Sequence, residues 1–380
     1  MRIGLNLLHA MPDVGGVWNY INNLLDAVAR EDASNEYVAF ITEVSAPLVP
    51  RRPNFRTVRV PLRPSVRAAR VFVENTMLPV LVRRERLDCL HWFANAQGIL
   101  NPAPAVVSVY DLQPFLSYAP MSRGKRWFLQ WRMRSTAKRA DMLLPMSQAT
   151  ARSLQELLNV PPQRMTVVPP TLESEFQPPD AAAVNQVRQR YALPSEFWLY
   201  VAHGYPHKNH ERLLQAYRVI RDANPGAWPL VLRGEAQPGF APFAELADTA
   251  GVSDHVIVLP RLKREELPAL YGAASALVFP SLYEGGGIPV LEAQACGCPV
   301  VASDIPAIQE FAGEAALYLN PQSTTDIKRA MIAIAADPAS RERLRRLGLE
   351  RARAFKASTG VHLLIDAYGR ACSMASRRAR

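Results

Sequence analysis

The chain has 380 residues, 49% of them hydrophobic and 21% charged, with a formal net charge of +10. This composition is ordinary for a soluble globular protein and excludes a mostly disordered chain, while the length predicts two domains of about 150 residues or more. No apolar run reaches the roughly 18 residues of a spanning helix, and residues 1–8 are too short for a signal peptide, so we expect a cytoplasmic protein. The positive charge favours anionic partners, namely nucleotides, a phospholipid surface or nucleic acid.

The first half of the chain begins like a nucleotide-binding fold. Residues 2–8 are predicted to form a buried strand, and residues 17–31 have the apolar spacing of a helix. Gly15 and Gly16 stand between them, at the carboxyl end of the strand, where such folds bind ligands. A simple turn is the alternative interpretation of the glycine pair.

Apolar runs and helical patterns alternate up to residue 168. Strands are expected at residues 37–42, 55–61, 89–93, 106–109, 142–145 and 165–168, and helices at 66–84, 124–139 and 147–158. This alternation predicts a mainly parallel sheet with helices on both faces. His91, at the end of a strand, is interpreted as a packed histidine.

One predicted helix, residues 124–139, combines basic and aromatic side chains. The residues concerned in and beside it are Arg123, Lys125, Arg126, Trp127, Phe128, Trp131, Arg132, Met133, Arg134, Lys138 and Arg139. Such a helix can lie on an anionic membrane surface. The alternative is a helix whose charged face is solvated and whose aromatic side packs inward.

Prolines and acidic residues around 169–182 mark an inter-domain linker, with a boundary expected at residues 170–190. We predict domains at residues 1–175 and 176–358, followed by a terminal helix at 359–380. Strands are expected at 197–203, 229–234, 255–260, 275–280, 299–303 and 316–320, with helices after His207, at 261–274 and from 326 onward.

The most informative stretch is residues 281–301, SLYEGGGIPVLEAQACGCPVV. Glu284 precedes three glycines, and Pro289 fits the first turn of a helix that runs to about Ala295 and contains Glu292. A glycine loop that opens a helix presents unpaired N–H groups and positive partial charge, which seat an anion. A glycine-rich turn with two solvated glutamates is the alternative.

This stretch resembles the donor-sugar motif of the family 4 retaining glycosyltransferases, in which two glutamates separated by seven residues surround a glycine-rich loop. The resemblance implies an α/β protein of the GT-B fold, two Rossmann-like domains whose parallel sheets face each other across a cleft. The terminal helix then crosses back to the first domain.

The resemblance also implies donor-binding residues. Glu284 and the loop through Gly286, Gly287 and Ile288 would hold the sugar ring, and Glu292 would accept hydrogen bonds from ribose hydroxyls. Residues 260–262, ending at Leu262, would hold the nucleobase through their backbone. Gly15 and Gly16 would lie near the donor phosphate, and Lys208, at the start of a helix, would bind the diphosphate.

Three positions depart from the family pattern. The family's arginine, six residues before the lysine, is Ala202 here, and Arg233 is the nearest substitute. Tyr110 replaces a histidine that lies near the transferred sugar, next to Asp111, which is a candidate to orient the acceptor hydroxyl or to act as base. Gly286 stands where the family usually has an aromatic residue.

The expected activity is therefore retaining transfer of a sugar, with mannose from GDP-mannose as the first candidate. The acceptor would be a glycan or lipid-linked saccharide of cell-surface polysaccharide synthesis, reached from the inner face of the cytoplasmic membrane. We expect no cofactor and, since no Asp-x-Asp pair occurs, no metal. The alternatives are a GT-B nucleotide-sugar epimerase or a non-catalytic sugar-nucleotide-binding scaffold.

Other classes are disfavoured by missing motifs. Neither half begins with GxGxxG, which argues against a dinucleotide-dependent dehydrogenase, and no nucleic-acid-binding motif accompanies the basic charge. The cysteines Cys89, Cys296, Cys298 and Cys372 lack metal-type spacing and are expected to be reduced and mostly packed.

Overall fold

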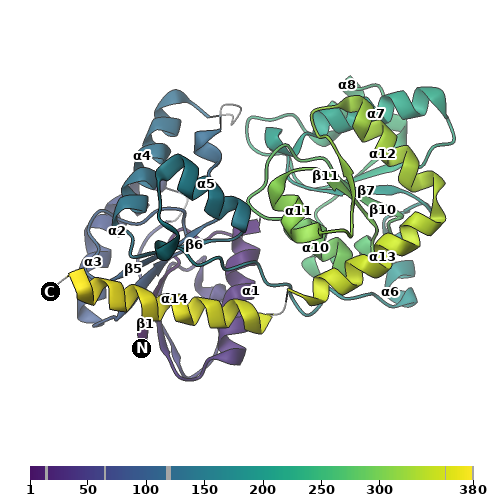
Figure 1. Cartoon of the computed structure of the whole chain (residues 1–380). Coiled ribbons are helices and arrows are strands. Elements are labelled where there is room, and N and C mark those ends of the chain that lie inside the picture. Colours follow the sequence, from purple (N-terminus) through teal and green to yellow (C-terminus); the bar gives the residue numbers. More distant parts are fainter. Residues whose placement is uncertain (13–15, 64–65, 117–120, 356, 379–380) are drawn as a thin grey trace. The chain divides into compact units, whose positions relative to one another are not determined.

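The computed structural model describes all residues except 13–15, 64–65, 117–120, 356 and 379–380. The chain divides into two units (Figure 1): unit 1 comprises Met1–Thr171 and Lys356–Arg380, and unit 2 comprises Leu172–Phe355. Each unit has its own sheet and its own hydrophobic core.

Unit 1 contains a six-stranded parallel sheet of order β3-β2-β1-β4-β5-β6. Its strands are β1 (Arg2–Asn6), β2 (Glu36–Ile41), β3 (Phe55–Arg59), β4 (Cys89–Trp92), β5 (Ala105–Val109) and β6 (Met142–Pro145). Its helices are α1 (Gly16–Glu31), α2 (Arg67–Asn75), α3 (Met77–Arg84), α4 (Arg123–Arg139), α5 (Gln148–Leu158) and α14 (Ala357–Arg378). The last helix packs against α1 and contacts β4, β5 and β6, so the end of the described chain completes the unit where the chain starts.

Unit 2 repeats this topology, with the strand order β12-β11-β10-β7-β8-β9 and parallel pairing throughout. Its strands are β7 (Trp198–Val201), β8 (Leu230–Arg233), β9 (Val256–Leu259), β10 (Ala276–Phe279), β11 (Val300–Ser303) and β12 (Leu317–Leu319). Its helices are α6 (Ala181–Arg190), α7 (His210–Ala223), α8 (Phe243–Thr249), α9 (Leu267–Ala273), α10 (Ile288–Ala295), α11 (Pro306–Ala312), α12 (Thr324–Ala336) and α13 (Pro338–Arg353).

The central strands are apolar because helices cover both faces of each sheet. In unit 2, Leu277 of β10 lies between Leu199 of β7 and Val300 of β11, and all three side chains are inaccessible to solvent. A parallel sheet buried on both sides requires such continuous apolar runs. The same requirement made the strands recognisable in the sequence, and the predicted α/β class with two parallel sheets is confirmed.

Three predicted elements differ from the structure. The helix expected at 66–84 is two helices broken at Thr76, because Pro79 has no N–H to donate to the carbonyl of Asn75. Residues 165–168 run beside β6 but form a single bridge, from Met165 to Leu143, instead of a strand. The linker predicted at residues 169–182 ends inside a helix, since Asp180 caps α6 by accepting a hydrogen bond from the Ala183 N–H at 2.7 Å, whereas the division between Thr171 and Leu172 lies within the boundary range predicted at 170–190.

Candidate functional site

The candidate donor site lies at the carboxyl ends of β7 and β10. These two strands are neighbours in the sheet, and the chain builds outward from them in opposite directions. Open α/β sheets bind ligands at this point of reversal, outside the carboxyl ends of the strands. The segment after β7 carries Lys208, and the segment after β10 carries Glu284, so both predicted residues follow strands that meet there.

Lys208 and Glu284 form an ion pair. The ammonium Nζ of Lys208 donates to Glu284 Oε1 at 2.6 Å, and the side chains are only 17% and 10% exposed. The two segments are also joined through the backbone, because the Leu282 N–H donates to the His207 carbonyl at 2.7 Å. The pair is thus held in one place by its own loops, and its partial burial strengthens the attraction.

The glycine loop leads directly into α10. Gly286 and Gly287 are buried, and a Cβ added at Gly287 would lie 3.3 Å from atoms of Ile308 and Phe311, so a side chain there would crowd α11. Ile288 is the first residue of α10, whose first turn contains Pro289 and no acidic residue. No carboxylate from the first turn of α10 therefore neutralises the positive end of this helix.

Glu292 lies inside α10, 4% exposed, and both of its oxygens already accept hydrogen bonds. Arg264 Nη2 donates to Oε1 at 2.9 Å, and the Tyr271 hydroxyl donates to Oε2 at 2.9 Å. Arg264 also places Nε 2.8 Å from both carboxylate oxygens of Glu173. Each oxygen of Glu292 keeps a second lone pair for a further donor.

This network shifts the pKa values of its members. Burial raises the pKa of Glu173, and the neighbouring Arg264 guanidinium opposes that shift. Burial and then the Glu292 carboxylate hold the pKa of the Tyr271 hydroxyl well above its usual range, so it is a hydrogen-bond donor at neutral pH. Sequence reasoning missed Arg264, Tyr271 and Glu173. The one sequence signal is that Arg264 and Tyr271 are seven residues apart, about two helical turns, which would place them on the same face of a helix.

Arg233 and Leu262 lie at the carboxyl ends of β8 and β9. Arg233 is half-buried, and its Nε is inaccessible without a hydrogen-bond partner. Burial and then the charge of the nearby Arg233 lower the pKa of His203, which follows β7. Gly234 has a φ of +153°, and a Cβ there would fall 1.9 Å from the Ala202 carbonyl oxygen. Leu262 is buried, with 4% of its surface exposed.

The predicted residues of unit 1 follow β1 and β5. Gly15 lies outside the described residues, and Gly16 begins α1 with open space around it. The Tyr110 hydroxyl donates to the Phe93 carbonyl at 2.7 Å, its ring packs edge-on against Tyr20, and burial raises its pKa well above the usual range. Its proton is therefore engaged in a structural hydrogen bond.

The neighbour of Tyr110 lies in a local turn. Asp111 is half-buried and accepts a hydrogen bond from the Gln113 N–H at 3.0 Å. As predicted, His91 is a packed residue, with Nδ1 2.8 Å from the Tyr368 hydroxyl and Nε2 2.8 Å from the Ser108 hydroxyl. Among the described residues no group of His, Cys, Asp and Glu side chains is arranged to hold a metal ion. No helix in the described part of the chain is both long and apolar enough to cross a bilayer.

Comparisons with known proteins agree with this architecture. The family described as Glycosyltransferase Family 4 matches residues 14–176, and Glycosyl transferases group 1 matches residues 185–351. The serotype-specific mannosyltransferase WbdA of Escherichia coli is 30% identical over 275 residues, which are 71% of this chain and 34% of WbdA. The O-antigen chain mannosyltransferase B of the same organism is 29% identical over 267 residues, 70% of each protein. The chain thus spans about a third of the first relatives it matches.

Solved structures share the fold. Sucrose-phosphate synthase from Thermosynechococcus elongatus superposes with a TM-score of 0.78 at 23% identity, over 97% of this chain and 98% of that one. WaaG, a glycosyltransferase involved in lipopolysaccharide biosynthesis, superposes with a TM-score of 0.70 at 16% identity, over 95% and 97% of the two chains. From its two family matches and its two six-stranded parallel sheets, we conclude that the chain belongs to the family 4 glycosyltransferases and has their GT-B fold.

Proposed function

We propose that the protein is a retaining glycosyltransferase that moves a sugar from a nucleotide-sugar to a saccharide acceptor in cell-surface polysaccharide synthesis. The observation that carries this proposal is the Lys208–Glu284 pair beside the first turn of α10, at the point where the sheet of unit 2 reverses. The names of the relatives, two of them mannosyltransferases, make GDP-mannose the first donor to test.

Each group at this site has a role in the proposal. The Lys208 ammonium and the positive end of α10 stabilise the diphosphate as it departs, and Arg233, with its unpartnered Nε, adds a second cation. Glu284 and the loop Gly286–Ile288 hold the sugar ring. Glu292 accepts from the ribose hydroxyls with its remaining lone pairs, and the backbone before and at Leu262 contacts the base.

In unit 1, Asp111 is the group we assign to the acceptor hydroxyl. Tyr110 acts through its packing, since its hydroxyl is committed to Phe93. The departing diphosphate takes the acceptor proton on the same face of the sugar, so the anomeric configuration is retained and neither Glu284 nor Glu292 becomes a covalent nucleophile. We propose no cofactor and no metal for this step.

A thermal-shift panel of nucleotide-sugars, followed by transfer assays with the stabilising donor, tests the proposal. A specific donor raises the Tm in proportion to the logarithm of its concentration above Kd. Sugar transfer to a saccharide or lipid-linked saccharide with the α-anomer retained is the expected result. Epimerisation of the donor without transfer, or binding without turnover across the acceptor panel, would assign the protein to the epimerase or scaffold class instead.

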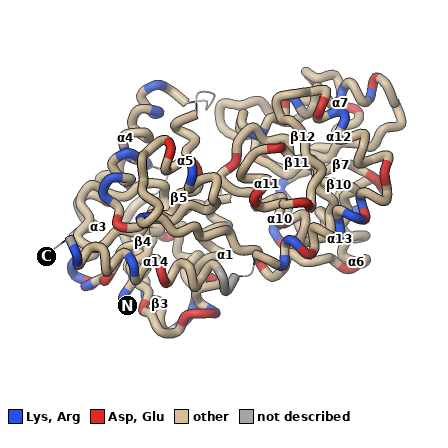
Figure 2. Tube along the Cα trace, viewed as in Figure 1, with Lys and Arg blue, Asp and Glu red and all other residues tan. Residues whose placement is uncertain are grey.

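We also propose that unit 1 contacts an anionic membrane through one face of α4. This face carries Arg123, Trp127, Trp131, Arg134 and Lys138, spaced three or four residues apart, and all five are exposed. Trp127 is 66% exposed and Trp131 41%, so these rings do not pack inward. Basic and aromatic side chains on one helical face suit the boundary between anionic headgroups and acyl chains. Figure 2 shows the basic residues along α4.

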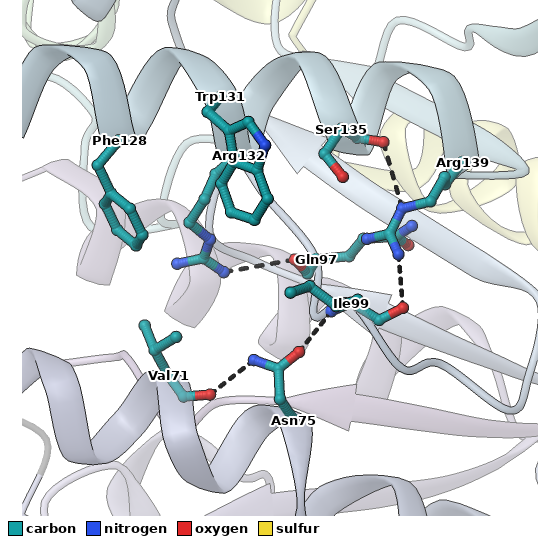
Figure 3. A pocket seen from close by; sticks show the side chains of 9 residues that line it. All are labelled: Val71, Asn75, Gln97, Ile99, Phe128, Trp131, Arg132, Ser135 and Arg139. Atoms are coloured by element: carbon teal, nitrogen blue, oxygen red, sulfur yellow. Dashed lines mark hydrogen bonds between the residues drawn. The ribbon is translucent and has the colours of Figure 1, made fainter.

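A hollow beside α4 continues this surface (Figure 3). Val71 and Asn75 of α2, Ile99, and Phe128 and Trp131 of α4 line it, and Ile99 is itself 54% exposed. Arg132 and Arg139 of α4 line the same hollow but are engaged by protein groups: Arg132 Nη2 lies 3.5 Å from the buried carboxylate of Glu74, and Arg139 donates to the carbonyls of Gly98 and Ile99. The exposed cations and rings of α4 are thus the ones available to lipid.

A further inference from the structure

The interface between β4 and α14 brings together residues far apart in the sequence. His91 Nδ1 of β4 lies 2.8 Å from the Tyr368 hydroxyl of α14. Alternate residues of a strand share a face, and residues four apart share a face of a helix. Cys89 therefore lies on the same side of β4 as His91, and Cys372 on the same side of α14 as Tyr368. Cys89 is about 6.6 Å from His91 along the strand, and Cys372 is about 6.0 Å from Tyr368 along the helix. Because these two steps are similar, Cys89 and Cys372 face each other as His91 and Tyr368 do.

Contacts at the second pair agree with this register. The Cys372 Sγ lies 3.4 Å from the carbonyl oxygen of Asp88, the residue just before Cys89. The two thiols are also near enough for each to shift the pKa of the other. Cys89 is inaccessible to solvent, whereas Cys372 is partly exposed. Reagents in solution therefore reach Cys372 first, with Cys89 directly behind it.

The interaction between the thiols also separates their acidities. It lowers the pKa of Cys372, and, together with burial, it raises the pKa of Cys89 well above its usual range. An accessible thiol with a lowered pKa next to a second, resolving cysteine is the arrangement of reversible redox sites.

We propose that Cys89 and Cys372 form a modification site, at which a small disulfide such as oxidised glutathione converts the pair into a protein disulfide between β4 and α14. The Cys372 thiolate attacks one sulfur of the reagent, forming a mixed disulfide and releasing one thiolate. Cys89 then loses its proton and attacks Cys372 Sγ, which forms the protein disulfide and releases the second thiolate. Two protein thiols are oxidised, and one reagent disulfide is reduced to two thiols.

The other two cysteines provide an internal control. Cys296 and Cys298 of unit 2 are buried on either side of Gly297, and burial raises the pKa of both, to about 12 for Cys298. Neither thiol is accessible, so the same reagent should leave both of them reduced. Selectivity for the first pair is thus a direct readout of the proposed geometry.

The test is oxidation of the folded, full-length protein with a series of glutathione redox buffers, followed by denaturing alkylation and peptide mass mapping. We expect a disulfide-linked peptide that joins Cys89 to Cys372, with neither of these cysteines alkylated. Cys296 and Cys298 should both be alkylated. The oxidised wild type should melt several degrees higher than the reduced form, because the bond joins two distant parts of unit 1. The Cys372→Ser variant should show no such difference between the two buffers.

Two results would overturn the proposal. One is a glutathione adduct that stays on Cys372 without transfer to Cys89. The other is the absence of any oxidation of the pair in buffers that fully oxidise a control dithiol peptide. Because Cys372 is partly exposed, its serine variant should fold, and dithiothreitol should return the wild-type Tm to its reduced value.

Discussion

The ammonium of Lys208 lies 2.6 Å from a carboxylate oxygen of Glu284, although 76 residues separate the two in the sequence. Each side chain neutralises the other in the described state. A nucleoside diphosphate that reaches this point offers Lys208 a second, stronger anion, and the sugar hydroxyls offer Glu284 new donors. The ion pair thus holds the ammonium and the carboxylate in position for a ligand, and neither partly buried charge is left unpaired.

Lys208→Gln should weaken donor binding, because the amide carries no charge to place on the diphosphate. We expect a rise of about 10-fold to 100-fold in the donor Kd, which corresponds to one charge-assisted contact. Titration of the donor by calorimetry or thermal shift measures it. Lys263→Gln, at an exposed lysine before α9, is the matched control and should bind as the wild type does. Equal affinity in the two variants would remove Lys208 from the site.

Arg264→Met should destabilise unit 2, because it leaves Glu173 and Glu292 without their shared cation. Breaking a buried pair costs about 3–5 kcal/mol, and we expect the lower part of this range, since the Arg264 side chain is 26% exposed. Urea unfolding measures the loss. Asp222→Asn breaks an exposed pair with Arg218 within α7 and should cost no more than about 0.5 kcal/mol. Similar small losses in both variants would show that the network contributes little.

His91 should make the protein sensitive to acid. Burial lowers its pKa to about 3 from the ordinary value of 6.5. Between those values the unfolded chain binds a proton that the folded protein does not, so the free energy of unfolding falls as the pH is lowered from 6.5 toward 3.

Replacing this histidine isolates its contribution. In His91→Asn the slope of unfolding free energy against pH over that window should decrease by up to about 1.4 kcal/mol per pH unit, one proton's worth. Urea titrations at several pH values give the slope. An unchanged slope in His91→Asn would contradict the assignment.

Replacing both exposed tryptophans of α4 by serine should release the protein from anionic vesicles. We expect about a 10-fold or greater loss of binding to vesicles containing phosphatidylglycerol, because two interfacial rings are removed while the cations remain. Flotation measures the bound fraction. Val219→Ser, at an exposed apolar position of α7, is the control. Wild-type protein that does not float with anionic vesicles at low salt would end the membrane proposal.

Chelation should leave transfer intact. The proposed diphosphate contacts are an ammonium, a guanidinium and a helix terminus, so the initial rate with excess EDTA should stay within about twofold of the untreated rate. A loss of tenfold or more that Mg²⁺ or Mn²⁺ restores would show that a cation takes part.

Much of the fold followed from the sequence because both sheets are buried on two sides. The central strands there are short apolar runs, and the intervening helices have their own period, so the alternation could be predicted. The break at Thr76 and the single bridge at Met165 were not, because both depend on which backbone groups find partners. Pro79 lies within the predicted helix and leaves the carbonyl of Asn75 without its helical donor.

The candidate site was predictable where its residues are close in sequence. The spacing of Glu284 and Glu292 predicted the loop and helix, and Lys208 was predicted at the start of a helix. The partners of Glu292 were hidden, since Glu173 reaches Arg264 across 91 residues and carries no local signal. Likewise, nothing near Tyr110 in the sequence indicates that its hydroxyl is taken by the carbonyl of Phe93.

Helix α14 also has a consequence for biosynthesis. Its buried Leu364, Tyr368 and Ala371 complete unit 1, yet the ribosome makes them after all of unit 2, residues 172–355. At about 5–20 residues per second, the delay is on the order of 10–40 s. During that time the nascent first sheet lacks one covering helix, so its apolar surface is open to chaperones, and unit 2 can mature before the older part of the chain.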